Sequence, residues 1–244
     1  MIFANVLQPL IDVANSILTF FHDTVGTTWG VAIILLTIVT RLAILPLSLK
    51  QIRSMRAMQA YQPQIKAIQE RYKDDRQRLQ RELMDFYREN SINPFASCVP
   101  LLLQLPVFMA LFYLLRSDEF SNELAASGDP GFLGITLDEK ATGAALIILV
   151  VLYFVTMVGS TSIMASSAEG NQKLMMYALP VVFTPLIINF PAGLVIYWIT
   201  TNLWTMGQQS VVKKLIPVPE KKTVEEVRAT APPPPPPRKK KRRR

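Results

Sequence analysis

The chain alternates between long apolar runs and shorter polar stretches. Such runs occupy residues 27–49, 93–115, 141–163, 175–190 and 191–209. A helix of about 20 apolar residues crosses the hydrocarbon of a bilayer, where the backbone must satisfy its own hydrogen bonds. The last two runs are joined by Pro191 and Gly193, which predict a turn. We therefore predict an all-α polytopic membrane protein with five transmembrane helices.

Residues 1–26 have a different, amphipathic pattern. Apolar side chains recur at helical spacing, whereas Asn5, Gln8 and Asp12 fall on the other face. The pattern predicts an external helix in the membrane interface. Because its polar face lacks the usual Lys and Arg residues, an additional packing helix is the alternative. No Lys or Arg precedes Arg41 and no lipobox cysteine follows, so we expect no cleaved signal peptide.

Residues 50–92 are too charged to enter a bilayer. Apolar residues at three- and four-residue steps form two stripes, and Asp74 and Asp75 lie between them. We predict a hairpin of two antiparallel helices, with Pro63 disturbing the first.

The basic residues predict the orientation of the chain. Residues 50–92 are rich in Lys and Arg, whereas residues 116–140 contain only Arg116 and Lys140. Because basic residues collect in cytoplasmic loops, the N-terminus and the loop 116–140 are predicted outside. The hairpin 50–92, the loop 164–174 and the tail 210–244 are predicted in the cytoplasm.

The composition excludes some kinds of site and predicts a basic tail at the end of the chain. With 244 residues, a net charge of +8 and Cys98 as the only cysteine, the chain has neither a disulfide framework nor a cysteine-based metal site. No cofactor or metal is predicted. The end, "APPPPPPRKKKRRR", predicts a stiff proline-rich spacer in a disordered tail. Its basic residues, which can bind ribosomal RNA phosphates or anionic lipids, are Arg238, Lys239, Lys240, Lys241, Arg242, Arg243 and Arg244.

Arg41 interrupts the first run, "GVAIILLTIVTRLAILPLSLK", near its middle. A charge at this depth costs about 2.5–3.5 kcal/mol on translocon scales and is a hypothesis of function by default. The other four runs contain no Asp, Glu, Lys, Arg or His, so the guanidinium must find water, a partner molecule or neutral groups. The neutral candidates at similar depth are Thr37, Gln104, Trp198, Thr201 and Asn202. Alternatively, Arg41 extends to the interface, the neutral residues bond helix to helix, and Trp198 only packs.

Three blocks, in this order, resemble the YidC family of membrane-protein insertases, relatives of the mitochondrial Oxa and chloroplast Albino insertases. They are "TRLAILPLSLKQIRSMRAMQ", "NPFASCVPLLLQLPVFMALFYLLR" and "FPAGLVIYWITTNLWTMGQQ", with the charged insertion after the first. The resemblance covers roughly residues 29–209. It implies a five-span insertase core around a hydrophilic groove that is closed toward the outside, with Arg41 as the groove arginine. Thr37, Gln104 and Trp198 match other groove residues.

The resemblance implies an insertase and chaperone rather than an enzyme. A nascent hydrophobic segment would pass along the lipid side while its acidic flank enters the groove. The implied partners are nascent membrane proteins, the ribosome, the Sec translocon, the signal recognition particle pathway and anionic lipids, with no small-molecule substrate. The implied location is the bacterial plasma membrane. The chain resembles the short bacterial type of the family, which has no large periplasmic domain. The alternative is an anion channel or transporter that uses Arg41 as its selectivity charge.

Overall fold

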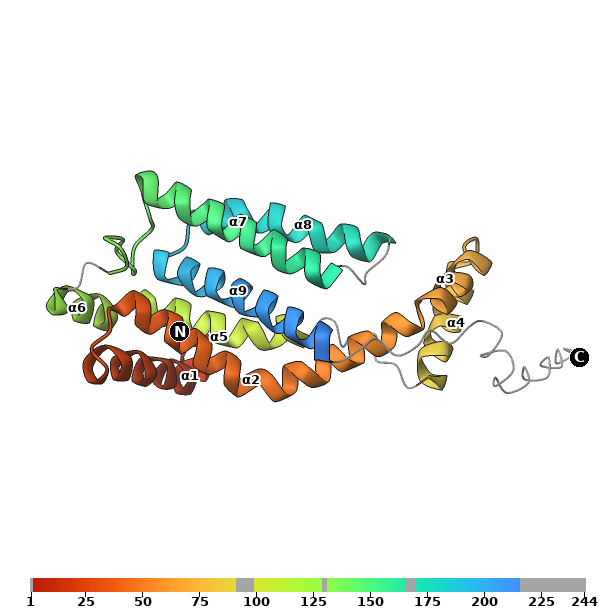
Figure 1. Ribbon diagram of the computed structural model, residues 1–244, viewed down its shortest axis with the longest axis horizontal. Coiled ribbons are helices and arrows are strands. Elements are labelled where there is room, and N and C mark those ends of the chain that lie inside the picture. The colour runs from red at the N-terminus through yellow and green to blue at the C-terminus, as the bar shows by residue number, and fades with distance from the viewer. Residues whose placement is uncertain (1, 91–98, 129–130, 166–169, 216–244) are drawn as a thin grey trace, which may run out of the picture. The chain divides into compact units, whose positions relative to one another are not determined.

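The computed structural model describes residues 2–90, 99–128, 131–165 and 170–215. In this part of the chain the regular elements are helices (Figure 1). They are α1 (Ile2–Thr19), the π-helical η1 (Phe20–Thr24), α2 (Trp29–Ala60), α3 (Gln62–Arg71), α4 (Arg76–Glu89), α5 (Val99–Leu115), α6 (Asp118–Ser127), α7 (Gly143–Ala165), α8 (Gly170–Ile187) and α9 (Ala192–Leu215). The chain forms two compact units, Met1–Ile52 with Phe95–Pro217, and Arg53–Pro94 with Val218–Arg244.

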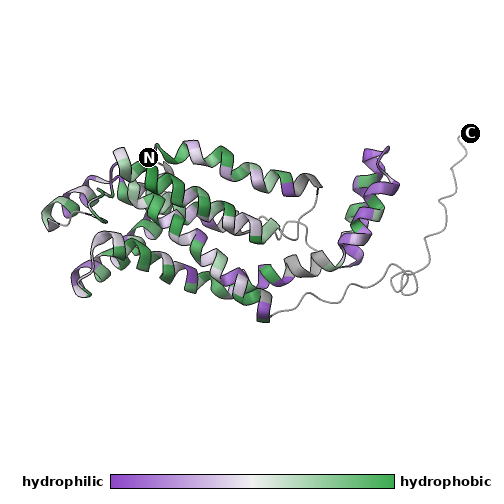
Figure 2. Ribbon diagram, turned by 45° about the horizontal axis from the view of Figure 1, so that its top comes forward, coloured by the Kyte–Doolittle hydropathy of each residue, from purple (hydrophilic) through white to green (hydrophobic). Residues whose placement is uncertain are grey.

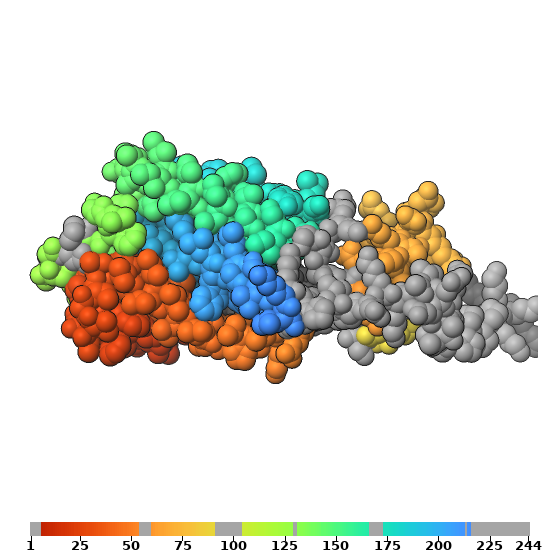
Figure 3. Space-filling view, in the orientation of Figure 1, coloured from red at the N-terminus to blue at the C-terminus, as the bar shows by residue number. Residues whose placement is uncertain are grey.

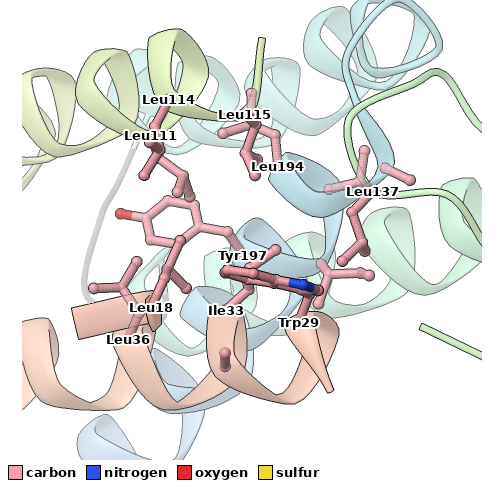
Figure 4. Close-up of a cluster of buried hydrophobic side chains, with 14 of the residues drawn as sticks. Leu18, Trp29, Ile33, Leu36, Leu111, Leu114, Leu115, Leu137, Leu194 and Tyr197 are labelled. Carbon is pink, nitrogen blue, oxygen red and sulfur yellow. The ribbon is translucent and has the colours of Figure 1, made fainter. Parts of the chain in front are cut away.

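The first unit has a core to which most of its helices contribute. In Figure 4, side chains of α2 and α5 meet Leu18, Leu137, Leu194 and Tyr197. The α2 and α5 residues in this cluster are Trp29, Ile33, Leu36, Leu111, Leu114 and Leu115. α7 packs closely against both α8 and α9, and α1 against α5. Figure 3 shows α9 between α7 and α2 on the face in view.

Loop residues 131–142 tie this core to the turn between α8 and α9. The backbone N–H groups of Ala192 and Gly193 donate to the carbonyl oxygens of Glu139 and Leu137, at 2.8 and 2.9 Å. Gly193 approaches α2 and α5 so closely that an added Cβ would lie 3.0 Å from the Ile33 Cδ1 atom. The chain turns at residues 188–191, and Gly193 already belongs to the first turn of α9. The loop before α7 holds this turn through the two hydrogen bonds.

Two features differ from the sequence expectations. α2 continues past residue 49 to Ala60 although Pro46 lies inside it, because one proline removes a single backbone donor and the residues after it suit a helix. The predicted loop 116–140 contains α6, which Ser117 caps by accepting a hydrogen bond from the Phe120 N–H at 3.2 Å. At its other end, Gly128 takes the left-handed conformation that ends many helices.

The second unit contains α3 and α4, which pack together. Residues Tyr72–Asp75 separate them, and the Asp75 carboxylate accepts a hydrogen bond from the Arg78 N–H at 3.0 Å. The rings of Tyr61 and Phe86 meet edge to face at 5.9 Å. Pro63 lies in the first turn of α3, where its missing donor is not needed. The helical stretch is interrupted at Tyr61, between the end of α2 and the start of α3, as expected if Pro63 disturbs the first helix of the hairpin.

Hydropathy separates the two units in Figure 2, where α3 and α4 are largely hydrophilic and the helices of the first unit largely apolar. Within the described residues, Trp29–Arg53 and Gly143–Ala165 are long and apolar enough to cross a membrane, and Gln104–Leu115 and Lys173–Ile187 are shorter apolar helices. α7 and α8 carry exposed apolar residues, among them Ile147 at 66% and Val181 at 64%. Faces of this kind suit contact with lipid.

Candidate functional site

Arg41 lies on α2 just beyond the packed core. Thr37, one turn before it, is fully buried, whereas Arg41 is partly exposed and Leu42 is 51% exposed. Burial along α2 therefore falls at the level of Arg41. The guanidinium occupies the boundary between a tightly packed part of the unit and a more open one.

A chain of hydrogen bonds joins Arg41 to two other helices. Its Nη2 atom donates to the Oε1 atom of Gln104 on α5 at 2.8 Å. The Nε2 atom of Gln104 in turn donates to the hydroxyl oxygen of Tyr197 on α9. Three segments that are distant in sequence thus meet at one polar cluster, which we call the Arg41 cluster: Arg41, Gln104 and Tyr197.

The Arg41 cluster carries an unbalanced positive charge. Among the described residues no carboxylate forms an ion pair with Arg41, and its one hydrogen bond goes to a neutral amide. A guanidinium has several N–H donors in a planar fork that matches a carboxylate. Because it is partly exposed and mostly unbonded, Arg41 can receive the oxygen atoms of an incoming acidic group.

The two threonines predicted for the site are buried near the cluster. The Thr37 hydroxyl donates to the Ile33 carbonyl oxygen of its own helix at 2.7 Å. Thr201 is 6% exposed and lies one turn after Tyr197 on α9. Their positions flank the cluster from α2 and α9. Thr37 uses its donor within its own helix.

Trp198 and Asn202 lie on another face of α9, directed toward other helices. The Trp198 ring stacks on Phe108 with centroids 4.7 Å apart and also meets the rings of Tyr153 and Phe190. The Asn202 amide donates to the Thr156 hydroxyl of α7 at 3.4 Å. These contacts favour a packing role for Trp198 and a hydrogen-bonding role between helices for Asn202 over direct contact with a substrate.

Tyr197 is the cluster member that sequence reasoning missed. Tyr197 directly precedes Trp198, a predicted site residue. It lies four residues before Thr201, another predicted site residue, so Tyr197 and Thr201 share one face of the helix. A buried tyrosine hydroxyl usually needs a hydrogen-bond partner. That requirement was the available signal. The predicted basic residues Arg238 to Arg244 lie outside the described residues, and no metal-binding group of side chains occurs among the described ones.

Comparisons with known proteins agree on one family. The family model described as 60Kd inner membrane protein matches residues 20–221. A protein named "Membrane protein insertase YidC" from Streptomyces avermitilis is 37% identical over 236 residues, which covers 83% of this chain and 55% of that protein. One of the same name from Pelobacter propionicus is 39% identical over 208 residues, covering 82% of this chain and 37% of that protein.

A solved structure is similar as well. The structure described as "Active YidC insertase crystal structure with the first transmembrane domain resolved" has a TM-score of 0.63 and 30% sequence identity. The match covers 86% of this chain and 46% of the other. The chain thus spans about half, or less, of the length of the relatives it matches.

Proposed function

The chain belongs to the family described as 60Kd inner membrane protein, and from this membership we propose that it is a membrane protein insertase. It is an all-helical membrane protein, and its relatives carry the name of that activity. The proposed task is to bring hydrophobic segments of nascent proteins into the bilayer and to help them fold. No covalent bond is made or broken in this process.

We propose five spans, formed by α2, α5, α7, α8 and α9. At about 1.5 Å per residue, α8 with 18 residues and α9 with 24 come close to or exceed the roughly 30 Å of a hydrocarbon core. The distribution of Lys and Arg supports an external N-terminus. It also supports a cytoplasmic hairpin of α3 and α4 and a cytoplasmic tail.

The observation that carries the mechanism is a partly exposed mid-helix arginine whose one hydrogen bond, among the described residues, goes to a neutral amide. The core on one side of Arg41 is closed by buried residues, and α7 and α8 have exposed apolar faces that suit lipid. In the proposed mechanism, the hydrophobic segment lies against lipid-facing helices. Its short acidic flank is drawn to Arg41, which shortens the apolar distance that the flank must cross.

The partners follow from this mechanism and from the sequence. Nascent membrane proteins are the substrates. The basic tail is the proposed binding segment for the ribosome or for anionic lipids. The Sec translocon and the signal recognition particle pathway are the proposed sources of substrates that do not arrive directly.

The test is insertion of a single-span substrate with an acidic N-terminal flank into proteoliposomes. Arg41→Ala, Arg41→Lys and Arg41→Glu are compared with the parent chain. Since a hydrogen bond to a charged group contributes about 1.5–3 kcal/mol, we expect Arg41→Ala to lower insertion by about tenfold or more. Arg41→Lys should retain most activity because it keeps the charge, and Arg41→Glu should retain the least.

Equal insertion by all four proteins would remove the charge of Arg41 from the mechanism. A steady ion conductance in proteoliposomes without any substrate would instead favour an anion channel. Both measurements use the same purified protein, so they can be made side by side.

A further inference from the structure

We propose that Tyr197 is a positioning residue, which acts through Gln104 to hold the Arg41 guanidinium where it receives an acidic flank. This inference rests on the proposed function and adds to it a residue that itself contacts no substrate. Its basis is the direction of the two hydrogen bonds in the Arg41 cluster.

Gln104 connects Arg41 and Tyr197 in one orientation only. An amide side chain has an acceptor end and a donor end, and a half-turn exchanges them. Arg41 can only donate, so it requires the Oε1 atom of Gln104, which it meets at 2.8 Å. The other end then presents Nε2, and this group needs an acceptor. The hydroxyl oxygen of Tyr197 supplies it.

Tyr197 is a fixed point, whereas the other two side chains are long and flexible. It is 2% exposed, and Figure 4 shows its ring in the core beside Leu111 and Leu18. Arg41 and Gln104 are only partly buried, so either would lose considerable rotamer freedom on being held. The packed Tyr197 ring therefore fixes the orientation of the Gln104 amide, and the amide in turn fixes the position of the Arg41 guanidinium.

The consequence concerns selectivity for charged flanks. Loss of the Tyr197 hydroxyl leaves the Arg41 charge in place but frees Gln104 to turn. Insertion of a substrate with an acidic flank should then fall by about two- to tenfold, the range expected for one net hydrogen bond. Insertion of a substrate with a neutral flank should not change, because it does not use the guanidinium.

The experiment uses the full chain in proteoliposomes and two single-span substrates. These differ only in the flank, which carries Asp and Glu in one and Asn and Gln in the other. The variants are Tyr197→Phe, Gln104→Leu, their double mutant and Arg41→Ala. Tyr153→Phe is the matched control, because it removes the same oxygen atom from another buried ring of the first unit, one that packs on Trp198.

We expect Tyr197→Phe and Gln104→Leu each to lower the ratio of acidic to neutral insertion. The double mutant should lower the ratio no further than the stronger single mutant, because the residues act in series. Tyr153→Phe should leave the ratio unchanged.

Three results would overturn the inference. One is an unchanged ratio in Tyr197→Phe while Arg41→Ala lowers it, which leaves the proposed function standing. Another is an equal loss with both flanks, which marks a purely structural role, and a third is full additivity in the double mutant. If Arg41→Ala itself leaves the ratio unchanged, the charge-based function fails, and the inference fails with it.

Discussion

Glu123 on α6 is a partly buried carboxylate in an acidic neighbourhood. Burial, together with the negative charges of Glu119 and Asp23, raises the pKa of Glu123 above its ordinary value, and His22 opposes the rise. A carboxyl whose folded-state pKa is raised binds its proton more tightly in the folded state. Its contribution to stability is therefore present at pH values below the ordinary pKa and is lost as the pH rises through the folded-state pKa.

Glu123→Gln should stabilise the protein at neutral pH, because the amide keeps the shape and removes the charge. We expect the melting temperature in detergent at pH 7 to rise modestly, on the order of 1–2 °C, since water screens the partly solvated parent carboxylate. Below the ordinary carboxyl pKa the difference between variant and parent should vanish. Glu139→Gln, at an exposed position of the neighbouring loop, is the control. A variant less stable than the parent at neutral pH would contradict the prediction.

Single residues also show where the sequence was sufficient for the site. Arg41 is conspicuous because a charged residue within an apolar run is costly in a membrane and is usually functional. Gln104 is then a candidate partner because it is a polar residue at similar depth. In the structure a hydrogen bond joins the two side chains, and their role toward a substrate stays a prediction. Tyr197 could not be selected in the same way, because a tyrosine in an apolar helix is unremarkable until its hydroxyl is seen to accept from Gln104. Partners are a property of packing, which sequence spacing does not contain.

At the scale of elements, Gly193 allows the start of α9 to pack closely against α2, α5 and the loop before α7. A Cβ atom at this position would lie 3.0 Å from Ile33 Cδ1, 3.1 Å from Leu115 Cδ1 and 3.1 Å from the Leu137 carbonyl oxygen. Gly193→Ala should therefore lower the free energy of unfolding by about 1–3 kcal/mol, the usual cost of overpacking. Thermal unfolding in detergent, followed by circular dichroism, measures it.

Gly207 on the same helix is the matched control, because an added Cβ there meets no atom within 4 Å. Gly207→Ala should be neutral or stabilising, by up to about 1 kcal/mol, since alanine favours a helix over glycine. Equal destabilisation by both substitutions would place the effect in the helix itself and refute close packing at Gly193.

The lengths of the apolar runs and the turn residues between them were enough to predict the helices of the first unit's core. Helix α6 and the true end of α2 were not predicted from them. α7 covers residues 143–165 where 141–163 was expected, because the apolar run itself determines the helix. α6 was missed since its residues lie in a polar loop, although Ser117 and Gly128 mark its two ends. α2 runs to Ala60 because charged residues continue a helix as readily as apolar ones. Hydropathy alone detects where the apolar run stops, not where the helix ends.

At the scale of the whole molecule, one chain combines parts that suit different media. The first unit presents apolar faces on α7 and α8 and places Arg41 beyond a packed core. The second unit contains the charged helices α3 and α4, in which no apolar residue is buried. The proposed insertase function needs both, since the proposed substrate leaves an aqueous complex and ends in lipid. The basic tail is the remaining part, and its role is testable by removing it.

Truncation after Pro237 removes seven consecutive basic residues. Contacts between basic side chains and phosphates release counterions, so ribosome binding through the tail should weaken and depend less steeply on salt after truncation. Co-sedimentation with ribosomes over a range of salt concentrations measures both effects. A chain with glutamine at residues 238–244 serves as the control for tail length. If ribosome pelleting at low salt is unchanged and binding to anionic vesicles is lost, the tail is a lipid anchor, because each basic residue near such a surface contributes about 1 kcal/mol.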